Sequence, residues 1–278
     1  MAGCYGKAGQ KPLGGHMQVD VLNPAQPRDL RVRMADGADD LKAAQHLRWQ
    51  VFCLELGATV PSAEGELDVD PFDTACDHLL VEDMTSGAAV TVGTYRLLRH
   101  GVAREIGGFY SAGEFDLDPL LGAPQAGAGE LLELGRSCVL PAYRNSGTIQ
   151  LLWRGIASYL KRHSISAMFG CASFAGTDPD AHAEALSYLH YNHLAPREAR
   201  VSALPEQFVD MARLPLGSFN PQVAARLLPP LIKGYLRLGA TVGNGAVIDH
   251  AFNTTDVFVM LPVDAISSRY LERLGKAA

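Results

Sequence analysis

Apolar residues follow two different periods along the first part of the chain. Leu30, Val32 and Met34 alternate with arginines, and this period of two predicts a strand with one buried face. Beyond them the spacing changes to three and four residues, which predicts a helix that ends where Gly57 stands. The apolar positions of that helix are Leu41, Ala44, Leu47, Val51 and Leu54.

Strand and helix patterns continue into the last third of the chain. Ser86 and Gly87 form a turn between two strands, and Pro229 with Pro230 opens a late helix. The further elements, in chain order, are strands at 78–81, 89–98 and 131–140, a helix at 148–163, a strand at 165–172, helices at 179–192 and 230–239, and a hairpin from 247–252 and 257–261. This order predicts an α/β fold with a mixed, mostly antiparallel sheet flanked by helices.

Length and composition favour one folded unit preceded by a tail. The 278 residues are 47% hydrophobic, enough to bury a core, and no composition shift marks an interior boundary. Residues 1–28 are rich in glycine, proline and glutamine, and we expect a flexible tail there. We expect 29–278 to form a single domain, including a C-terminal extension from about residue 199. A formal net charge of −6 argues against a dedicated nucleic-acid binder.

Cysteine spacing and hydropathy indicate the setting of the protein. The five cysteines lie far apart, so no CxxC pair indicates a zinc ribbon. Their odd count and the lack of a secretory hydrophobic region are typical of a reducing cytoplasm. No run of about eighteen apolar residues exists to span a membrane. His190 and His193 have no third ligand at a convincing spacing, so we predict no metal site.

Residues 133–148 form the segment with the most chemical information. A strand enters a turn of small residues at 141–147, and a helix begins near Thr148. Free backbone N–H groups and the helix dipole at such a turn suit a phosphate group. An ordinary strand–turn–helix corner has the same pattern, so the pattern alone leaves both interpretations open.

The turn resembles the phosphopantetheine loop of the GNAT acyltransferases, in which small residues follow an arginine or glutamine. Ile149 departs from that pattern at the last small position. In enzymes that use coenzyme A this loop binds a pyrophosphate, whereas acyl carrier protein offers a single phosphodiester. A loop with fewer phosphate contacts suits the single phosphodiester, so the departure favours acyl carrier protein over coenzyme A. The resemblance implies that the phosphopantetheine arm is bound by Val139, Leu140, Arg144, Asn145, Ser146, Gly147 and Thr148.

Longer motifs resemble two related families of acyltransferases. Arg48…Phe52, Phe72-Asp73, Gly93…Arg96 and Glu133-x-x-Arg136 are similar to acyl-homoserine-lactone synthases. The more extensive resemblance is to the ornithine-lipid N-acyltransferases, also labelled hemolysin-like GNATs, through the motifs at 72–81, 93–98, 108–112, 133–138, 169–174, 186–190, 233–240 and 252–257. This resemblance implies a GNAT-type fold.

The resemblance also implies a reaction. A 3-hydroxyacyl group moves from the phosphopantetheine thioester of acyl carrier protein to the α-amine of ornithine, giving lyso-ornithine lipid, and no cofactor is bound. The alternatives are the same reaction on glutamine, lysine or glycine, a lactone synthase, or a membrane-active hemolysin-like protein. Because the product is a lipid, peripheral contact with the inner membrane surface through 227–232 stays open, beside core packing of the same residues.

Amide formation from a thioester needs a base, and Glu133 is the candidate. The alternative is that Glu133 is a structural carboxylate that pairs with Arg136. We group Arg136 itself with the catalytic residues. Residues 133 and 136 of a regular strand face opposite sides, so this pair needs a bulge, and Gly135 makes one plausible. The resemblance to GNAT enzymes implies that Tyr188, on the predicted helix 179–192, is the acid for the leaving thiol, and a core tyrosine is the alternative.

Charged residues elsewhere suggest an acceptor site and a docking surface. Arg48, Phe52, Asp73, Arg96 and Asp249 are candidates for the acyl channel or acceptor site, with fold-stabilising ion pairs as the alternative for the charged ones. The resemblance makes Asp249 and Asp256 candidates to recognise the second amine of ornithine, with hydrogen bonds to the backbone of a turn as the alternative. The acidic carrier protein is expected to dock on one helix face through Arg154, Lys161 and Arg162, for which a solvated face is the alternative.

Overall fold

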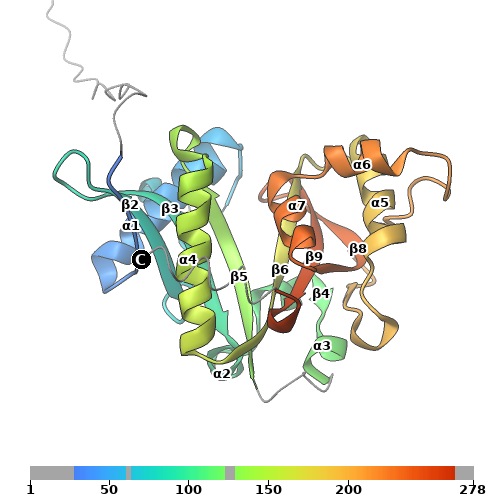
Figure 1. The fold of residues 1–278 in the computed structure, drawn as a ribbon, viewed down its shortest axis with the longest axis horizontal. Helices are drawn as coiled ribbons and strands as arrows, with labels where there is room; N and C mark the ends of the chain where they lie inside the picture. The colour runs from blue at the N-terminus through green and yellow to red at the C-terminus, as the bar shows by residue number, and fades with distance from the viewer. Residues whose placement is uncertain (1–27, 61–63, 123–128, 267–278) are drawn as a thin grey trace, which may run out of the picture.

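A mixed sheet forms the centre of the protein in the computed structural model, which describes residues 28–60, 64–122 and 129–266. Its strands are β1 (Leu30–Met34), β2 (Asp77–Asp83), β3 (Val90–Arg99), β4 (Phe115–Asp116), β5 (Glu130–Val139), β6 (Ile165–Ala175), β7 (Ser202–Ala203), β8 (Thr241–Asp249) and β9 (Thr254–Pro262). They lie in the order β1-β2-β3-β5-β6-β9-β8-β7-β4 (Figure 1). Only the pairs β5–β6 and β7–β8 of this described sheet are parallel, so the predicted mixed, mostly antiparallel sheet is confirmed.

Helices cover both faces of the sheet. The core of one face includes buried residues of α4 (Ser146–Arg162), α5 (Ala183–His193) and α7 (Pro230–Arg237). The other face is covered by α1 (Ala38–Arg48), its π-helical continuation η1 (Trp49–Glu55) and α2 (His100–Glu105). In the described ranges, no helix has both the length and the apolar character that crossing a bilayer requires.

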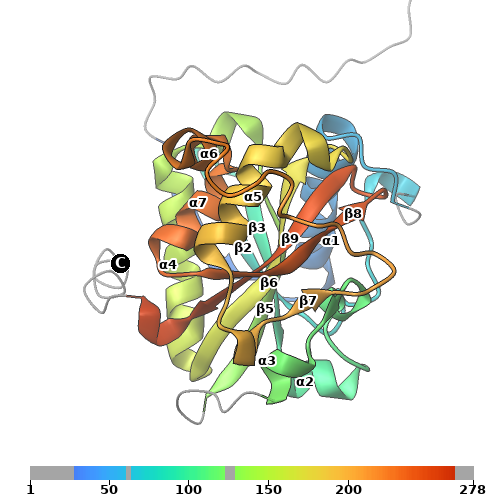
Figure 2. The same ribbon diagram turned by 90° about the vertical axis from the view of Figure 1, so that its right-hand side faces the viewer.

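Shorter helices connect these elements. They are η2 (Glu64–Glu66), η3 (Tyr110–Gly113), α3 (Asp118–Gly122), η4 (Pro141–Tyr143), η5 (Pro179–His182), η6 (Arg197–Ala199), α6 (Pro221–Leu227) and η7 (Val263–Ala265). Both ribbon views place α6 at the opposite end of the molecule from α2 and α3 (Figures 1 and 2). The segment beyond residue 199 supplies β7, β8 and β9 to the common sheet, whereas residues 1–27 of the predicted tail lie outside the described residues.

The long predicted elements are confirmed, with shifts of a few residues at their ends. The helix expected to stop at Gly57 is α1 with η1, and Gly57 has φ 74°, a conformation that favours glycine. The strands β4 and β7 and the helices α2, α3 and α6 are not in the predicted order. Each has two to seven residues, which is too short to produce a recognisable period.

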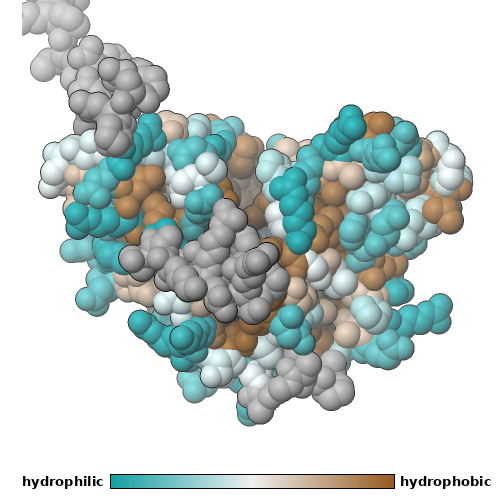
Figure 3. Space-filling view, viewed as in Figure 1, coloured by the Kyte–Doolittle hydropathy of each residue, from teal (hydrophilic) through white to brown (hydrophobic). Residues whose placement is uncertain are grey.

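The sheet splits at its centre, between β5 and β6. These strands pair in parallel only from Glu130 to Glu133, opposite Ile165 to Phe169. Beyond that point β5 stays paired with β3, and β6 with β9, so the two strands diverge (Figure 1). Gly170 stands at the fork, where an added Cβ would lie 2.2 Å from the carbonyl oxygen of Leu134. The space-filling view shows the molecule notched between its two halves (Figure 3).

Candidate active site

A pocket of about 270 Å³ lies at the fork of β5 and β6. Its walls include residues 133–137 of β5 and 168–173 of β6. Successive residues of a strand point to opposite faces of a sheet. These two stretches therefore line the pocket from both faces, with an apolar wall on one face and a polar wall on the other. Because the strands diverge here, the pocket reaches both faces of the sheet.

The wall on the side of α4 and α7 is apolar. Tyr95 and Tyr235 are buried in it with their hydroxyl oxygens 3.2 Å apart, and Trp153 of α4 packs edge-on against Tyr235. Other side chains that line this part belong to the same core as α4: Leu134, Met168, Ala172, Val259 and Leu261. This wall suits a hydrocarbon chain.

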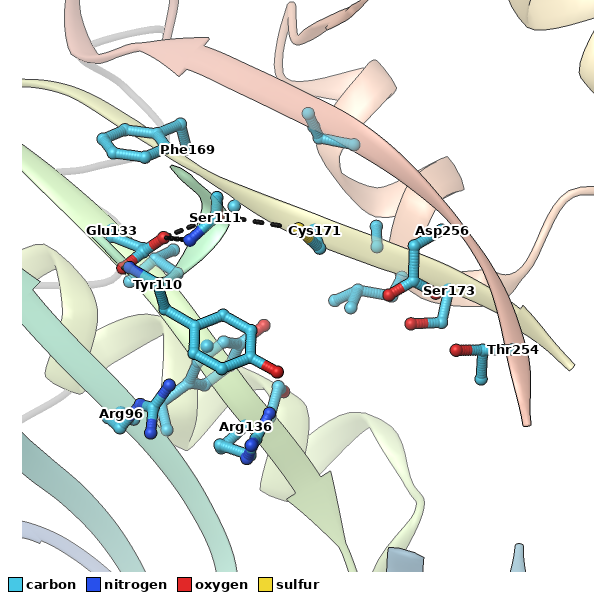
Figure 4. A pocket seen from close by; sticks show the side chains of 18 of the residues that line it. Arg96, Tyr110, Ser111, Glu133, Arg136, Phe169, Cys171, Ser173, Thr254 and Asp256 are labelled. Carbon is cyan, nitrogen blue, oxygen red and sulfur yellow. Dashed lines mark hydrogen bonds between the residues drawn. The ribbon is translucent and has the colours of Figure 1, made fainter. Parts of the chain in front are cut away.

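The opposite wall contains Glu133, held by the η3 turn. Its carboxylate accepts the backbone N–H of Tyr110 at 2.9 Å, the backbone N–H of Ser111 at 2.7 Å and the Ser111 hydroxyl at 2.5 Å (Figure 4). Burial raises the pKa of Glu133, and these hydrogen bonds oppose the rise. The side chain is therefore a fixed carboxylate with an increased proton affinity, facing the pocket.

Three arginines and three aspartates form a network beside Glu133. Arg48 binds Asp68 at 2.8 Å and Asp73 at 2.7 Å, and its guanidinium is fully buried. Arg96 lies 2.7 Å from Asp70, which also pairs with Arg136 at 2.7 Å. The loop that carries Asp68, Asp70 and Asp73 therefore buries all three carboxylates. Equal numbers of opposite charges let the loop pack against the sheet.

The network also orients the strand bulge of β5. Arg136 has φ 48°, and the register between β3 and β5 shifts at this point, so the predicted bulge is confirmed. The bulge directs Arg136 to Asp70 and to the rings of Tyr110 and Phe252, 4.8 and 4.4 Å from the guanidinium carbon, instead of to Glu133. The buried Nε of Arg136 lies 3.4 Å from a carboxylate oxygen of Asp68. Arg136 lines the pocket as a cation held by Asp68 and Asp70.

A second group of carboxylates lies where β8 and β9 meet the end of η3. Oxygens of Glu114, Asp249 and Asp256 lie within 4.8 Å of one another. Burial raises the pKa of Glu114 to about 7, and Asp256 adds to this rise. Burial also raises the pKa of Asp256 to about 6. We predicted no metal site from the histidines, yet this cluster has the charge to attract a cation.

The turn before α4 caps the helix and has little free donor capacity. The side chain of Asn145 accepts the backbone N–H groups of Gly147 and Thr148. Arg144 forms a bidentate ion pair with Glu55, with both N–O distances at 2.6 Å. The lining of the pocket reaches Ser137 on β5, so Val139, Leu140 and the turn residues, Ser146 included, lie beyond it.

The structure separates several other predicted residues from the pocket. Tyr188 lies outside the lining, with its hydroxyl 3.2 Å from Nε2 of His193. Lys161 and Arg162 are in the last turn of α4, roughly 22 Å along the helix from the turn at its start, at 1.5 Å per residue. Arg154 lies between these ends. Of the predicted channel residues, the structure brings Phe52, Arg96 and Asp249 into the lining, whereas Arg48 and Asp73 support them from behind.

Sequence reasoning missed Tyr110, Ser111, Glu114 and Cys171 as functional candidates. Ser111 links them, because its hydroxyl contacts Glu133 and lies 3.5 Å from the sulfur of Cys171, which is 3.3 Å from Glu114. A signal was present in the motif at 108–112, which contains two aromatic residues and a serine. No periodic pattern joins this short turn to a strand twenty residues away.

Comparisons with known proteins identify a domain family and several relatives. The acetyltransferase (GNAT) domain family matches residues 47–154. The L-ornithine N(alpha)-acyltransferase of Brucella abortus (strain 2308) is 50% identical over 255 residues, which cover 90% of each chain. Three further curated proteins of that name match at 42 to 49% identity.

Two solved structures are similar to this chain. FeeM, an N-acyl amino acid synthase from uncultured soil microbes, matches with a TM-score of 0.50 and 11% identity, covering 91% of this chain and 99% of that one. The acyl-homoserine-lactone synthase LasI matches with a TM-score of 0.46 and 14% identity, covering 84% of this chain and 90% of that one.

Proposed function

The chain belongs to the family of L-ornithine N(alpha)-acyltransferases, and from that premise we propose that it acylates the α-amine of ornithine. The proposed donor is a 3-hydroxyacyl thioester on the phosphopantetheine arm of acyl carrier protein, and the proposed product is lyso-ornithine lipid. The observation that supports this most is a pocket with an apolar wall on one face of the split sheet and charged groups on the other.

The two faces suit the two substrates. The acyl chain lies against the apolar wall near Tyr235 and Leu261, where burial of methylenes favours binding by about 0.8 kcal/mol each. The amino acid lies on the polar wall, where Arg136 offers a cation to its carboxylate. The thioester carbonyl then sits at the fork, between the two walls. Placing both reactants in one pocket lowers the entropic cost of the reaction.

In the proposed reaction the neutral α-amine attacks the thioester carbonyl. A C–N bond forms, and the C–S bond breaks when the intermediate collapses. Glu133 accepts the proton that the amine nitrogen loses, and the phosphopantetheine thiolate leaves and is protonated. The raised pKa of Glu133 suits this role, because a carboxylate with a higher proton affinity is a stronger base. The tyrosines in the pocket lining are Tyr95, Tyr110 and Tyr235, so they replace Tyr188 as candidate acids for the thiol.

Carrier protein is favoured as the donor by the turn before α4. Asn145 occupies the amides of Gly147 and Thr148, which leaves few N–H groups for the pyrophosphate of coenzyme A. The single phosphodiester of the carrier-protein arm needs fewer hydrogen-bond donors than a pyrophosphate. Of the proposed docking residues, only Arg154 lies near this turn, about two helical turns from the start of α4.

A donor comparison tests the docking residue. We expect Arg154→Glu to raise KM for acyl carrier protein several-fold and to leave KM for a short acyl-pantetheine thioester unchanged. Lys161→Glu makes the same charge change at the far end of α4 and serves as the matched control. Equal effects of Arg154→Glu on both donors would contradict docking at this position.

The reaction is tested by thiol release from 3-hydroxyacyl carrier protein with ornithine, glutamine, lysine and glycine in turn. We expect turnover with ornithine that falls by about 10²- to 10⁴-fold in Glu133→Gln, the range for loss of a general base. Ser111→Ala removes the hydroxyl donor but keeps the base, so its loss should be much smaller. Turnover with another amino acid but not with ornithine would mean that this other amino acid is the acceptor. An active Glu133→Gln variant would mean that Glu133 is not the base.

Peripheral membrane contact is part of the proposal. Leu227 of α6 is 58% exposed and Leu231 of α7 is 38% exposed, and Leu231 also lines the pocket. Apolar side chains at the pocket edge offer a path for a lipid product into a bilayer. Sedimentation with vesicles that contain anionic lipid tests this contact. We expect Leu227→Ser together with Leu231→Ser to reduce binding, and unchanged binding would rule out this surface.

A further inference from the structure

Three carboxylates from separate parts of the chain converge next to the catalytic pocket. Glu114 follows η3, Asp249 ends β8 and Asp256 lies on β9. Asp249 and Asp256 line the pocket, and Figure 4 shows the carboxylate of Asp256 directed into it beside Ser173. Like charges in a buried place repel one another, so such a cluster has a cost to stability unless a cation joins it.

The carboxylates also have unused hydrogen-bond capacity. The side chain of Asp256 is 6% exposed, and its buried Oδ1 has no hydrogen-bond partner. An unsatisfied buried acceptor of this kind points to a ligand that donates hydrogen bonds. Asp249 is held in place, because its Oδ1 accepts the backbone N–H groups of Ala251 and Phe252 at 2.8 and 3.0 Å.

From this arrangement we infer that Glu114, Asp249 and Asp256 bind the side-chain ammonium group of the acceptor amino acid. The inference rests on the proposed function and makes it more specific. It assigns the selection of a diamino acid, rather than glutamine or glycine, to these three side chains.

The geometry fits an ammonium group. The three oxygens lie within 4.8 Å of one another, so a group between them lies at most about 2.8 Å from each, within reach of hydrogen bonds. An ammonium nitrogen has three N–H donors, one for each carboxylate.

The distance to the reacting amine also fits. Contacts of 2.5, 3.5 and 3.3 Å connect Glu133 to Glu114 through Ser111 and Cys171, so the two carboxylates are at most about 9 Å apart. The nitrogens of ornithine are five bonds apart and reach roughly 6 Å, and a hydrogen bond of about 3 Å at each end spans the remainder. One molecule can therefore place its α-amine at Glu133 and its ammonium group in the cluster.

Norvaline tests the inference, because it has the carbon skeleton of ornithine with hydrogen in place of the ammonium group. In the wild type we expect kcat/KM for ornithine to exceed that for norvaline by about 100-fold or more, as in sites built around a polar group of the substrate. Glu114→Gln and Asp256→Asn should each lower the ratio of kcat/KM for ornithine to kcat/KM for norvaline by about 10- to 100-fold. Glu105→Gln, at an exposed glutamate of α2, is the charge-matched control.

The outcomes separate this inference from the proposed function. Equal use of ornithine and norvaline by the wild type, or an unchanged preference in both variants, would overturn the inference and leave the acyltransferase reaction standing. No turnover of any amino acid by the wild type would overturn both. A thermal stabilisation by Mg²⁺ or Ca²⁺ that both variants lose, together with an unchanged preference for ornithine, would make the cluster a metal site instead.

Discussion

Replacement of Arg48 by methionine tests whether this arginine belongs to the acceptor site or to the framework behind it. The guanidinium is fully buried and donates to Asp68 at 2.8 Å and to both carboxylate oxygens of Asp73, at 2.8 and 2.7 Å. Methionine fills similar space without charge, so the variant leaves two buried carboxylates short of their main partner. Such a loss typically costs about 3–5 kcal/mol.

The surroundings place Arg48→Met near the lower end of that range. Asp73 keeps the amide of Gln45 at 2.9 Å and Arg96 at 3.3 Å, and Asp68 keeps Arg136 at 3.4 Å. We therefore expect the free energy of unfolding to fall by about 3 kcal/mol in urea titrations at pH 7. Arg31→Met, at an exposed arginine paired with the exposed Asp29, is the control and should cost no more than about 1 kcal/mol.

The loss should also depend on pH. Burial alone would raise the pKa of Asp73, but the Arg48 guanidinium outweighs burial and holds that pKa well below its usual range. A depressed pKa stabilises the fold above the unfolded value, near 3.9, and this contribution is lost as the pH falls below it. The difference between wild type and Arg48→Met should therefore shrink below pH 4. A difference under 1 kcal/mol at pH 7, or a large change in KM for ornithine without loss of stability, would refute the framework role.

Three further predictions concern single positions. Gly170→Ala should lower the free energy of unfolding by about 1–3 kcal/mol in urea titrations, because its Cβ would meet the Leu134 carbonyl. Gly234→Ala is the control and should not destabilise α7, because nothing lies within 4 Å of the new Cβ. Asn145→Ala should cost about 1 kcal/mol in the same assay by uncapping α4, and no loss would mean that the cap is replaced. The raised pKa of Glu114, about 7, means that the folded state binds a proton that the unfolded chain releases, so stability falls as the pH rises from about 4.5 to 7. Glu114→Gln should remove at most about 3 kcal/mol of that fall, and parallel stability profiles of variant and wild type between pH 5 and 8 would contradict the shift.

The pattern of apolar residues was enough to predict the framework of the fold. β1, α1 and α4 each bury one face, so a period of two or of 3.6 residues identifies them locally. The motif around Glu133 was recognisable for a similar reason, since strand, bulge and turn follow one another in the sequence. The two-residue strands β4 and β7 have no period, and they exist because neighbouring strands supply their hydrogen bonds.

The site itself depends on contacts between distant segments, and only the tertiary structure decided them. Asp70 is an ordinary acidic loop residue until Arg96 and Arg136 surround it, and Tyr188 is a plausible acid until the pocket opens elsewhere. Glu114 and Asp256 are 142 positions apart, yet the sheet brings their carboxylates together. The sequence by itself determined which segments are strands and helices and which family they resemble. Burial and pairing across the split sheet decided which charges meet, because electrostatic interactions depend on distance in space and not along the chain.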